Sequence, residues 1–307
     1  MNTDWLRTLV AIVDEGSFEA AADELGVSAS AVSQRVRALE KHVGQLVVQR
    51  TLPCRPTPAG EQVLRMARQV VMISDETMAS LKRGAEADGV LRLAVNADSL
   101  ATWFRPVLAE AAGWPDMTLR LELEDQDHSA RLLRRGDVVA VVTSDPVPVQ
   151  GCRIVPLGAM TYVPVAAAGL VARHGGADTP DWAAMPALRY NAKDGLQLDF
   201  LRQLGITDLP RQPQVPGSEA FLAGVEAGLG WGMIPVAQLE RRIEDGRLVR
   251  LPGAAVDVAL HWQVWSIDSP RIERLGRAVR EAAAALTSGR PVAGRPAPAA
   301  PPRPGSA

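Results

Sequence analysis

The stretch SFEAAADELGVSASAVSQRVRALE, residues 17–40, decides the fold of the N-terminal part of the chain. It predicts two short helices joined by a tight turn, because Ser17 and Ser28 are good N-caps and Gly26 suits the positive φ at a helix end. Apolar residues recur at the spacing of one helix face: Phe18, Ala21, Ala22 and Leu25, then Val32, Val36 and Leu39. The alternative is any small helical hairpin.

The second helix presents small and polar side chains outward. With about eleven residues it is roughly 16 Å long, and its width suits a major groove of about 12 Å. A helix over Trp5–Asp14 supplies the third wall that a helix-turn-helix needs. The candidate DNA-binding residues on or before the second helix are Ser28, Ser30, Ser33, Gln34, Arg35 and Arg37.

Positive charge is concentrated next to this helix. The whole chain carries a formal net charge of −2, but residues 28–68 hold seven Lys or Arg and two Glu, a surplus of five. A phosphate backbone is the natural partner of such a surplus. For Arg65 and Arg68, on the next helix, a solvated face is the alternative.

A small β wing is predicted after the second helix. A β-branched pair, Val47-Val48, precedes a proline-punctuated turn at Thr51–Pro56. Arg50 and Arg55 are candidates for contact with phosphate or the minor groove, the alternative being that they only solubilise a loop.

A long helix is predicted from Thr57-Pro58, a cap followed by proline at the first helical position, to about Arg83. A heptad seam favours a dimer contact along it, although packing against its own domain is the alternative. The seam residues are Leu64, Ala67, Val71, Ser74, Met78 and Leu81. Residues 84–89 are a predicted hinge.

Beyond residue 89 the pattern alternates between strands and helices, which predicts α/β layers around a parallel sheet. Expected strands are Val90–Val95, Thr118–Leu123, Val138–Val142, Thr161–Val165, Gly232–Ile234 and Leu260–Trp265. Expected helices are Thr102–Ala112, Ser129–Arg135, Leu196–Leu204, Ser218–Ala227 and Ile272–Ala285. Residues 288–307, rich in Pro and Ala, are expected to be a disordered tail.

Composition excludes several classes. The two cysteines, Cys54 and Cys152, have neither disulfide nor metal-ligand spacing. No signal sequence and no apolar run of about 18 residues is present, so a reduced, cytoplasmic protein without a membrane partner is expected. His128 lies beside two aspartates, but no second histidine has ligand spacing, so no metal is expected.

The first ~85 residues resemble the LysR-type transcriptional regulators. The matching text is Phe18-x-x-Ala-Ala-x-x-Leu-x-Val-Ser, Ala31-Val32-Ser33-Gln34-x-Val36-x-x-Leu39-Glu40, Gly44-x-x-Leu46-Val47-x-x-Arg50 and Thr57-Pro58-Ala59-Gly60. The wing departs from the commoner family text at Leu52-Pro53-Cys54, where Arg55 is a possible substitute. The resemblance implies a winged helix-turn-helix, a linker helix, and an effector domain of two Rossmann-like α/β lobes similar to a solute-binding protein.

The effector half resembles the branch of this family that controls export of lysine and arginine. The resemblance rests on the text at residues 95–104, 124–134 and 227–235. It implies an activator that responds to L-lysine or L-arginine, needs no cofactor, and binds double-stranded promoter DNA as a homodimer or homotetramer, with RNA polymerase as a further partner. A LysR-type regulator of another effector is the alternative.

Ligands of open α/β sheets bind at the carboxyl ends of strands. A basic amino acid needs carboxylates around its ammonium groups, and the helices at Ser99 and Ser218 offer N–H groups for its carboxylate. The effector-binding candidates are Asp98, Ser99, Leu100, Asp125, Thr143, Ser218 and Glu219. Asp194 is a further acid from the second lobe, and Asp127 has helix capping as its alternative.

The predicted organisation is residues 1–58 for the DNA-binding domain, 59–89 for the linker helix and hinge, and 90–287 for the effector domain. Lobe I covers about 90–160 and 268–287, and lobe II about 161–267. A different class remains open, in which the α/β half is a solute-binding module or an enzyme. Against catalysis, the sequence has no Gly-x-Ser-x-Gly, no phosphate-cradling loop and no zinc-type histidine pair.

Overall fold

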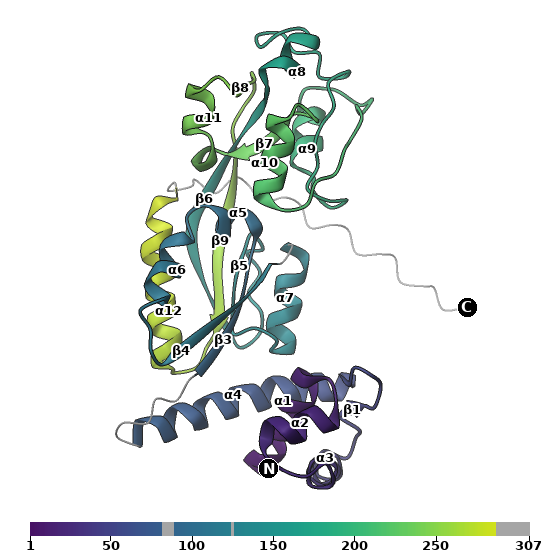
Figure 1. Ribbon diagram of the computed structural model, residues 1–307, viewed down its shortest axis with the longest axis vertical. Helices are drawn as coiled ribbons and strands as arrows, with labels where there is room; N and C mark the ends of the chain where they lie inside the picture. Colours follow the sequence, from purple (N-terminus) through teal and green to yellow (C-terminus); the bar gives the residue numbers. More distant parts are fainter. Residues whose placement is uncertain (82–88, 124–125, 287–307) are drawn as a thin grey trace, which may run out of the picture.

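The computed structural model describes residues 1–81, 89–123 and 126–286. A helical N-terminal unit leads through one long helix to two α/β lobes (Figure 1). The hinge at residues 84–88, Asp125 and the tail at 288–307 lie outside the described residues. Gly89, the last residue of the predicted hinge, is the first residue of a strand instead.

The N-terminal unit contains three helices, α1 (Thr3–Glu15), α2 (Phe18–Leu25) and α3 (Ala29–Val43). The predicted caps are confirmed: the Ser17 hydroxyl accepts from the Ala20 amide at 3.0 Å, and Gly26 ends α2 at φ +62°. The apolar stripes of the three helices meet in one core, with α1 as its third wall. Helix α3 runs to Val43 and is therefore longer than the eleven residues expected.

The predicted wing is a two-stranded antiparallel hairpin of β1 (Val48–Gln49) and β2 (Arg55–Pro56). Val47 and Val48 are buried in the same core as α1–α3, so the wing is anchored from below while its tip remains exposed. The cap of the next helix joins it, because the Thr57 hydroxyl donates to the Leu46 carbonyl at 2.6 Å.

The predicted seam residues of the long helix α4 (Pro58–Leu81) are buried at the start of the helix and exposed at its end. Leu64 and Ala67 are fully buried against the N-terminal core, where α1 is the main partner of α4. The prediction of a dimer contact is therefore wrong for these two residues, and packing within the domain is the correct reading. Met78 and Leu81, at the other end, are 49% and 72% exposed.

The effector half has a seven-stranded mixed sheet, with strand order β4-β3-β5-β9-β6-β7 and β8 paired to β6. The strands are β3 (Gly89–Val95), β4 (Met117–Leu123), β5 (Ala140–Thr143), β6 (Cys152–Ala167), β7 (Gly232–Pro235), β8 (Leu248–Arg250) and β9 (Val256–Trp265). Only β4, β3 and β5 pair in parallel; β9, β6, β7 and β8 pair antiparallel. The expectation of a purely parallel sheet was wrong, because β6 and β9 are long strands that pair directly with each other.

Helices cover both faces of the lobes. In lobe I, α6 (Arg105–Ala111) and α12 (Pro270–Ala282) pack together, while α7 (Gln126–Arg135) contacts β5 from the other face (Figure 1). Lobe II carries α8 (Ala168–Arg173), α9 (Leu196–Gln203), α10 (Ser218–Glu226) and α11 (Glu240–Glu244). The predicted helix Thr102–Ala112 corresponds to α6, which begins three residues later because residues 102–104 form a turn. A separate short helix that was not predicted, α5 (Ala97–Ala101), precedes that turn on an Asn96 cap.

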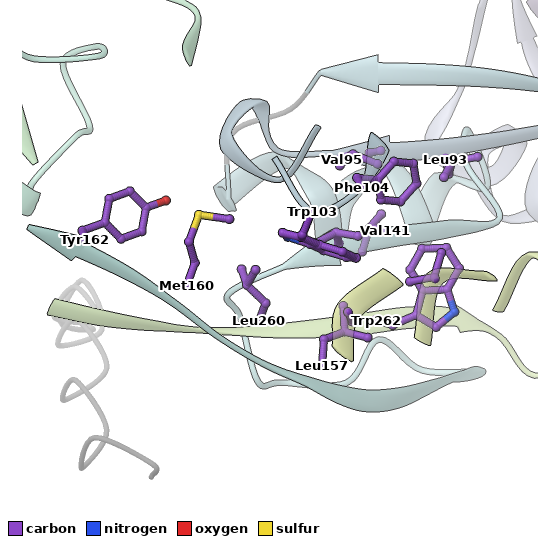
Figure 2. Close-up of a cluster of buried hydrophobic side chains, with 14 of the residues drawn as sticks. Leu93, Val95, Trp103, Phe104, Val141, Leu157, Met160, Tyr162, Leu260 and Trp262 are labelled. Atoms are coloured by element: carbon purple, nitrogen blue, oxygen red, sulfur yellow. The ribbon is translucent and has the colours of Figure 1, made fainter. Parts of the chain in front are cut away.

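β6 and β9 connect the lobes. β6 pairs with β9 from Cys152 to Tyr162 and then continues into lobe II, where it pairs with β7 and β8. Residues 261–264 of β9 pair with β5 of lobe I, although the predicted range for lobe II, about 161–267, includes them. Figure 2 shows Met160 and Tyr162 on this crossing, near Trp103 and Leu260 of the lobe I core.

A candidate nucleic-acid interface and effector cleft

The outer face of α3 lies on the side of the helical unit away from the effector lobes, with α4 between them (Figure 1). Ser30, Gln34 and Arg37 are exposed on it, and Ser33 and Arg35 are half-buried. Ser28 is also exposed, but its hydroxyl accepts from the Ala31 amide at 3.2 Å and lies 2.9 Å from the Ser30 hydroxyl. Ser28 therefore fixes the start of α3, and the longer side chains beyond it reach outward.

The two wing arginines are also exposed. The Arg50 guanidinium lies 4.9 Å from the centre of the Phe18 ring, which holds it between the wing and α2 by a cation–π contact. Arg55 occupies β2. Within the described residues, no carboxylate pairs with Arg35, Arg37, Arg50 or Arg55, so these four cations remain available to a polyanion.

Two cations of the predicted surplus have other partners. Arg68 is only 11% exposed and lies between Asp14 of α1 (2.6 Å) and Asp137 of lobe I (2.7 Å). Arg65 donates to the Gln150 carbonyl of lobe I. The reading of both as a solvated face was wrong: they join α4 to the effector half of the same chain.

Three polar groups come together from distant parts of the chain where β6 passes from lobe I to lobe II, and they mark the candidate effector cleft. Asp98 belongs to α5 of lobe I, Tyr162 to β6 at the crossing, and Asp194 to a loop of lobe II. The Tyr162 hydroxyl donates to Asp98 Oδ2 at 2.8 Å. The charges of Asp98 and Asp194 act on each other and on Tyr162, which places all three in one neighbourhood.

Burial governs the ionisation of this cluster. It raises the pKa of Tyr162 well above the usual value, and the negative charge of Asp98 adds to that effect, so the hydroxyl keeps its proton near neutrality. Burial also raises the pKa of Asp194, against hydrogen bonds from the Tyr190 and Leu196 amides and the positive charge of Arg189. Two neighbouring half-buried carboxylates favour a cationic ligand, which would relieve their repulsion.

Of four further predicted effector residues, Thr143, Ser218 and Leu100 have partners within the protein, whereas the buried Ser99 hydroxyl has no hydrogen-bond partner among the described residues. Ser99 and Thr143 are buried, and the Thr143 hydroxyl accepts from the Asp145 amide at 3.1 Å. Ser218 begins α10 and its hydroxyl accepts from Gln238 Nε2 at 3.0 Å. Leu100 packs against the lobe I core.

Glu219 has a partner across the lobes. Its carboxylate lies 2.9 Å from the Arg105 guanidinium, which joins α10 of lobe II to α6 of lobe I, and both side chains are more than 60% exposed. The structure therefore brings Asp194, rather than Glu219, to Asp98. Tyr162 was not anticipated from the sequence, because nothing in a predicted strand shows which strand crosses between lobes. Asp125 lies outside the described residues, and so do the side chains of Asp127 and His128.

The described residues contain neither a metal-ligand cluster nor a membrane-spanning helix. No group of three or more His, Cys, Asp or Glu side chains is arranged to hold a metal ion there. Helices long and apolar enough to cross a bilayer are also missing from the described part of the chain.

Comparison with known proteins agrees with this division of the chain. Residues 3–61 match the bacterial regulatory helix-turn-helix protein model of the lysR family, and residues 84–284 match the LysR substrate binding domain. The chain belongs to the LysR family of DNA-binding transcriptional regulators, with an N-terminal winged helix-turn-helix and a two-lobed α/β effector domain.

Within that family, the chain is similar to regulators named for lysine and arginine. It is 44% identical to the lysine export transcriptional regulatory protein LysG of Corynebacterium glutamicum, over 92% of this chain and 98% of that one. The crystal structure of ArgP from Mycobacterium tuberculosis superposes with a TM-score of 0.86 at 42% identity, covering 94% of this chain and all of that one. Full-length LysG from Corynebacterium glutamicum with bound effector Arg gives 0.78 at 43% identity and the same coverage.

Proposed function

We propose that this regulator senses L-lysine or L-arginine and activates transcription of a gene that exports basic amino acids. The observation that carries the proposal is the convergence of Asp98 and Asp194 from opposite lobes on Tyr162. Carboxylates contributed by both lobes can each bind one of the two cationic groups of a basic amino acid and so hold the lobes together, and a ligand shifts a conformational balance only by such differential contacts. The similarity to LysG with bound Arg supports the same ligand class.

The ligand's carboxylate has a separate place in this proposal. Helix α10 begins at Ser218 without a side-chain cap, so its first backbone N–H groups are directed toward the loop before it. The start of a nine-residue helix favours an anion. The other predicted effector residues, Ser99, Leu100, Thr143 and Glu219, would then form the walls of the site, and Asp125 stays a prediction.

Binding of L-lysine and L-arginine to the full-length protein, measured by calorimetry beside L-norleucine and L-glutamate, tests the ligand class. Norleucine has the length of lysine without the side-chain ammonium, so it should bind at least about tenfold more weakly if the carboxylates recognise that charge. Equal affinity for lysine and norleucine would refute the role of the carboxylates. Formation of a product from either amino acid would favour the enzymatic alternative.

The DNA side of the proposal is tested separately. We propose that Gln34 and Arg37 read base edges, while Arg35, Arg50 and Arg55 contact phosphates. On a randomised duplex pool, Gln34→Ala and Arg37→Ala should relax sequence preference, whereas Arg55→Ala should weaken all duplexes about equally and reduce the salt dependence. An unchanged preference in Gln34→Ala and Arg37→Ala would remove both residues from base readout.

Assembly completes the proposed mechanism. Val70, Ile73, Met78 and Leu81 form an exposed apolar stripe on α4, which we assign to pairing with a second copy of the chain. Two copies place two α3 helices on two half-sites, and two such dimers make a tetramer. The complex would act in the cytoplasm at promoters, in contact with RNA polymerase, and without a cofactor.

A further inference from the structure

We propose that Arg189 is the positioning residue of the effector cleft: its guanidinium binds the carbonyls of the loop that follows and thereby directs the Asp194 carboxylate toward the cation of the bound amino acid. The inference rests on the proposed function, because it acts through Asp194. It concerns a residue outside the Asp98–Tyr162–Asp194 cluster itself.

The backbone of Arg189 is fixed to the core of lobe II. Its amide donates to the Pro213 carbonyl at 2.9 Å, and its carbonyl accepts from the Val215 amide at 2.9 Å. The preceding residue, Leu188, is fully buried and donates to the Trp231 carbonyl at 2.8 Å. The backbone hydrogen bonds therefore fix the position of the Arg189 Cα from which the side chain extends.

The guanidinium of Arg189 reaches in two directions at once. Nη2 donates to the carbonyls of Ala192 (2.5 Å) and Asp194 (2.8 Å), and Nε donates to the same Asp194 carbonyl at 3.1 Å. On the other side, Nη1 donates to Gln212 Oε1 at 3.2 Å. A planar fork with fixed donors can hold all these acceptors together, whereas a lysine ammonium is a single point that cannot span them.

The loop held in this way closes around the Asp194 side chain. Its two carboxylate oxygens accept from the backbone: Oδ2 from Tyr190 at 2.8 Å and Oδ1 from Leu196 at 3.2 Å. Asn191 Oδ1 accepts from the amides of Lys193 and Asp194 at 2.8 and 3.0 Å. Arg189 binds the opposite, carbonyl side of the same turn, so its loss frees the turn to rotate the carboxylate away.

Arg189 also influences the charge state of Asp194. Burial is the main factor that raises the pKa of Asp194, and the negative charge of Asp98 acts in the same direction. The positive charge of Arg189 opposes both, with the backbone donors, while Tyr162 faces the cluster as a neutral hydroxyl. A cation binds only the ionised carboxylate, so lysine affinity should fall as the pH drops through the pKa of Asp194, and removal of the Arg189 charge should move this fall to higher pH.

The experiment is calorimetric titration of the full-length protein with L-lysine at a series of pH values from neutrality downward, because a carboxyl with a raised pKa loses its charge at a higher pH than an ordinary one. The variants are Arg189→Lys, Arg189→Gln and Asp194→Asn. Arg202→Gln is the matched control, an exposed arginine of lobe II that pairs only with Asp199 three residues earlier among the described contacts. Circular dichroism and thermal unfolding of each variant verify the fold.

Arg189→Lys keeps the charge and loses the fork, so lysine affinity at neutral pH should fall about tenfold with the acid limb of the curve unmoved. Arg189→Gln should weaken binding at least as much and shift that limb to higher pH, and Arg202→Gln should behave as wild type. Wild-type affinity in Arg189→Lys, or an acid limb that Arg189→Gln leaves in place, overturns the inference. If Arg189→Gln does not fold, the affinity of Arg189→Lys alone decides.

Asp194→Asn separates this inference from the proposed function. A loss of lysine affinity in Asp194→Asn, combined with wild-type binding in Arg189→Lys, would overturn the role of Arg189 and leave the cleft assignment standing. Wild-type lysine affinity in Asp194→Asn would overturn both the role of Arg189 and the assignment of Asp194 to the effector cleft.

Discussion

At the scale of single residues, the hydroxyl of Tyr162 is the contact that joins the crossing strand to lobe I. It is buried and donates to Asp98 Oδ2 at 2.8 Å. Because burial and the Asp98 charge raise its pKa, the hydroxyl stays protonated and remains a donor over the whole neutral range. A neutral donor to a carboxylate is among the stronger hydrogen bonds in proteins.

Tyr162→Phe keeps the ring and removes this donor. We expect the free energy of unfolding to fall by about 1–3 kcal/mol, because the half-buried Asp98 carboxylate loses a hydrogen bond to a charged acceptor. Urea denaturation measures the change, and an unaltered m-value would show that the unfolded state is the same. Asp98→Ala, which removes the acceptor, is the companion variant: if Tyr162→Phe destabilises it as much as it destabilises wild type, the hydroxyl acts elsewhere.

Residue types and strand ends were enough to single out Asp98, an acid that follows a strand of an α/β sheet, and its role as an effector ligand stays a prediction. They were not enough to choose between Asp194 and Glu219, two acids of lobe II in similar sequence surroundings. The choice depends on Arg105, which lies more than a hundred residues from Glu219 and pairs with it across the lobes. No local sequence pattern predicts a salt bridge between residues so far apart in the chain.

At the scale of elements, predictions succeeded where a cap or a glycine marks a boundary and failed where long-range pairing overrides local pattern. The caps of α2, α3 and α4 were correctly predicted. The first part of β6 was missed because Pro156 and Gly158 interrupt any strand pattern, and the structure accommodates them by a register shift against β9. Short α8, α11 and β8 have too few residues for a periodic signal.

A glycine at the end of α7 is required by the neighbouring element. Gly136 has φ +75°, and a Cβ built on it would lie 2.9 Å from the Arg65 Cα of α4. Gly205 has nearly the same φ, +77°, with no atom within 4 Å of a built Cβ. The two positions therefore carry equal backbone strain, and only Gly136 adds a clash with backbone.

Gly136→Ala should destabilise the protein by more than Gly205→Ala. The control should cost about 1 kcal/mol, the price of a positive φ for alanine, and the excess in Gly136→Ala measures the approach of α4 to lobe I. Chemical denaturation of both variants gives the comparison. Equal losses would mean that the α7–β5 turn moves away from α4 without cost.

The exposed apolar residues at the end of α4 allow a test of the proposed dimer contact. Met78→Glu together with Leu81→Glu should lower the mass seen by light scattering toward that of one chain, because charges on a dimer seam are desolvated without partners. Leu204→Glu changes a side chain that is similarly exposed, on lobe II, and should leave the mass unchanged. An unchanged mass in the double variant would place the dimer contact elsewhere.

At the scale of the whole molecule, α4 meets its own lobe I along one polar stripe. Glu61, Arg65, Arg68, Met72 and Glu76 recur every three or four residues, so they share one helix face. Their partners are spread over lobe I: Arg135, the Gln150 carbonyl, Asp137, the lobe I core and the Ser269 hydroxyl. Asp14 of α1 extends the contact, since it pairs with both Arg68 and Arg92. A sequence cannot reveal this stripe, because its partners lie about 60 to 190 residues away.

The side-chain contacts of this stripe join the effector lobes directly to the helix that carries the DNA-binding unit. Breaking them should therefore reduce the coupling between ligand and DNA. Asp137→Asn removes the carboxylate that pairs with Arg68 and Arg135 but lies outside both binding sites. Lysine affinity in the absence of DNA should stay within about twofold of wild type, because the cleft is intact. The factor by which lysine changes DNA affinity should fall toward one from a coupling that is typically 1–3 kcal/mol.

Fluorescence anisotropy of a selected duplex, with and without saturating L-lysine, measures that factor, and calorimetry measures lysine affinity alone. Asp245→Asn is the control, since it breaks the exposed Arg247–Asp245 pair on lobe II, far from α4. Because linkage is reciprocal, the duplex must change lysine affinity by the same factor, and this too should shrink in Asp137→Asn. Full coupling in Asp137→Asn would show that ligand closure reaches the DNA through contacts between chains rather than through the polar stripe of α4.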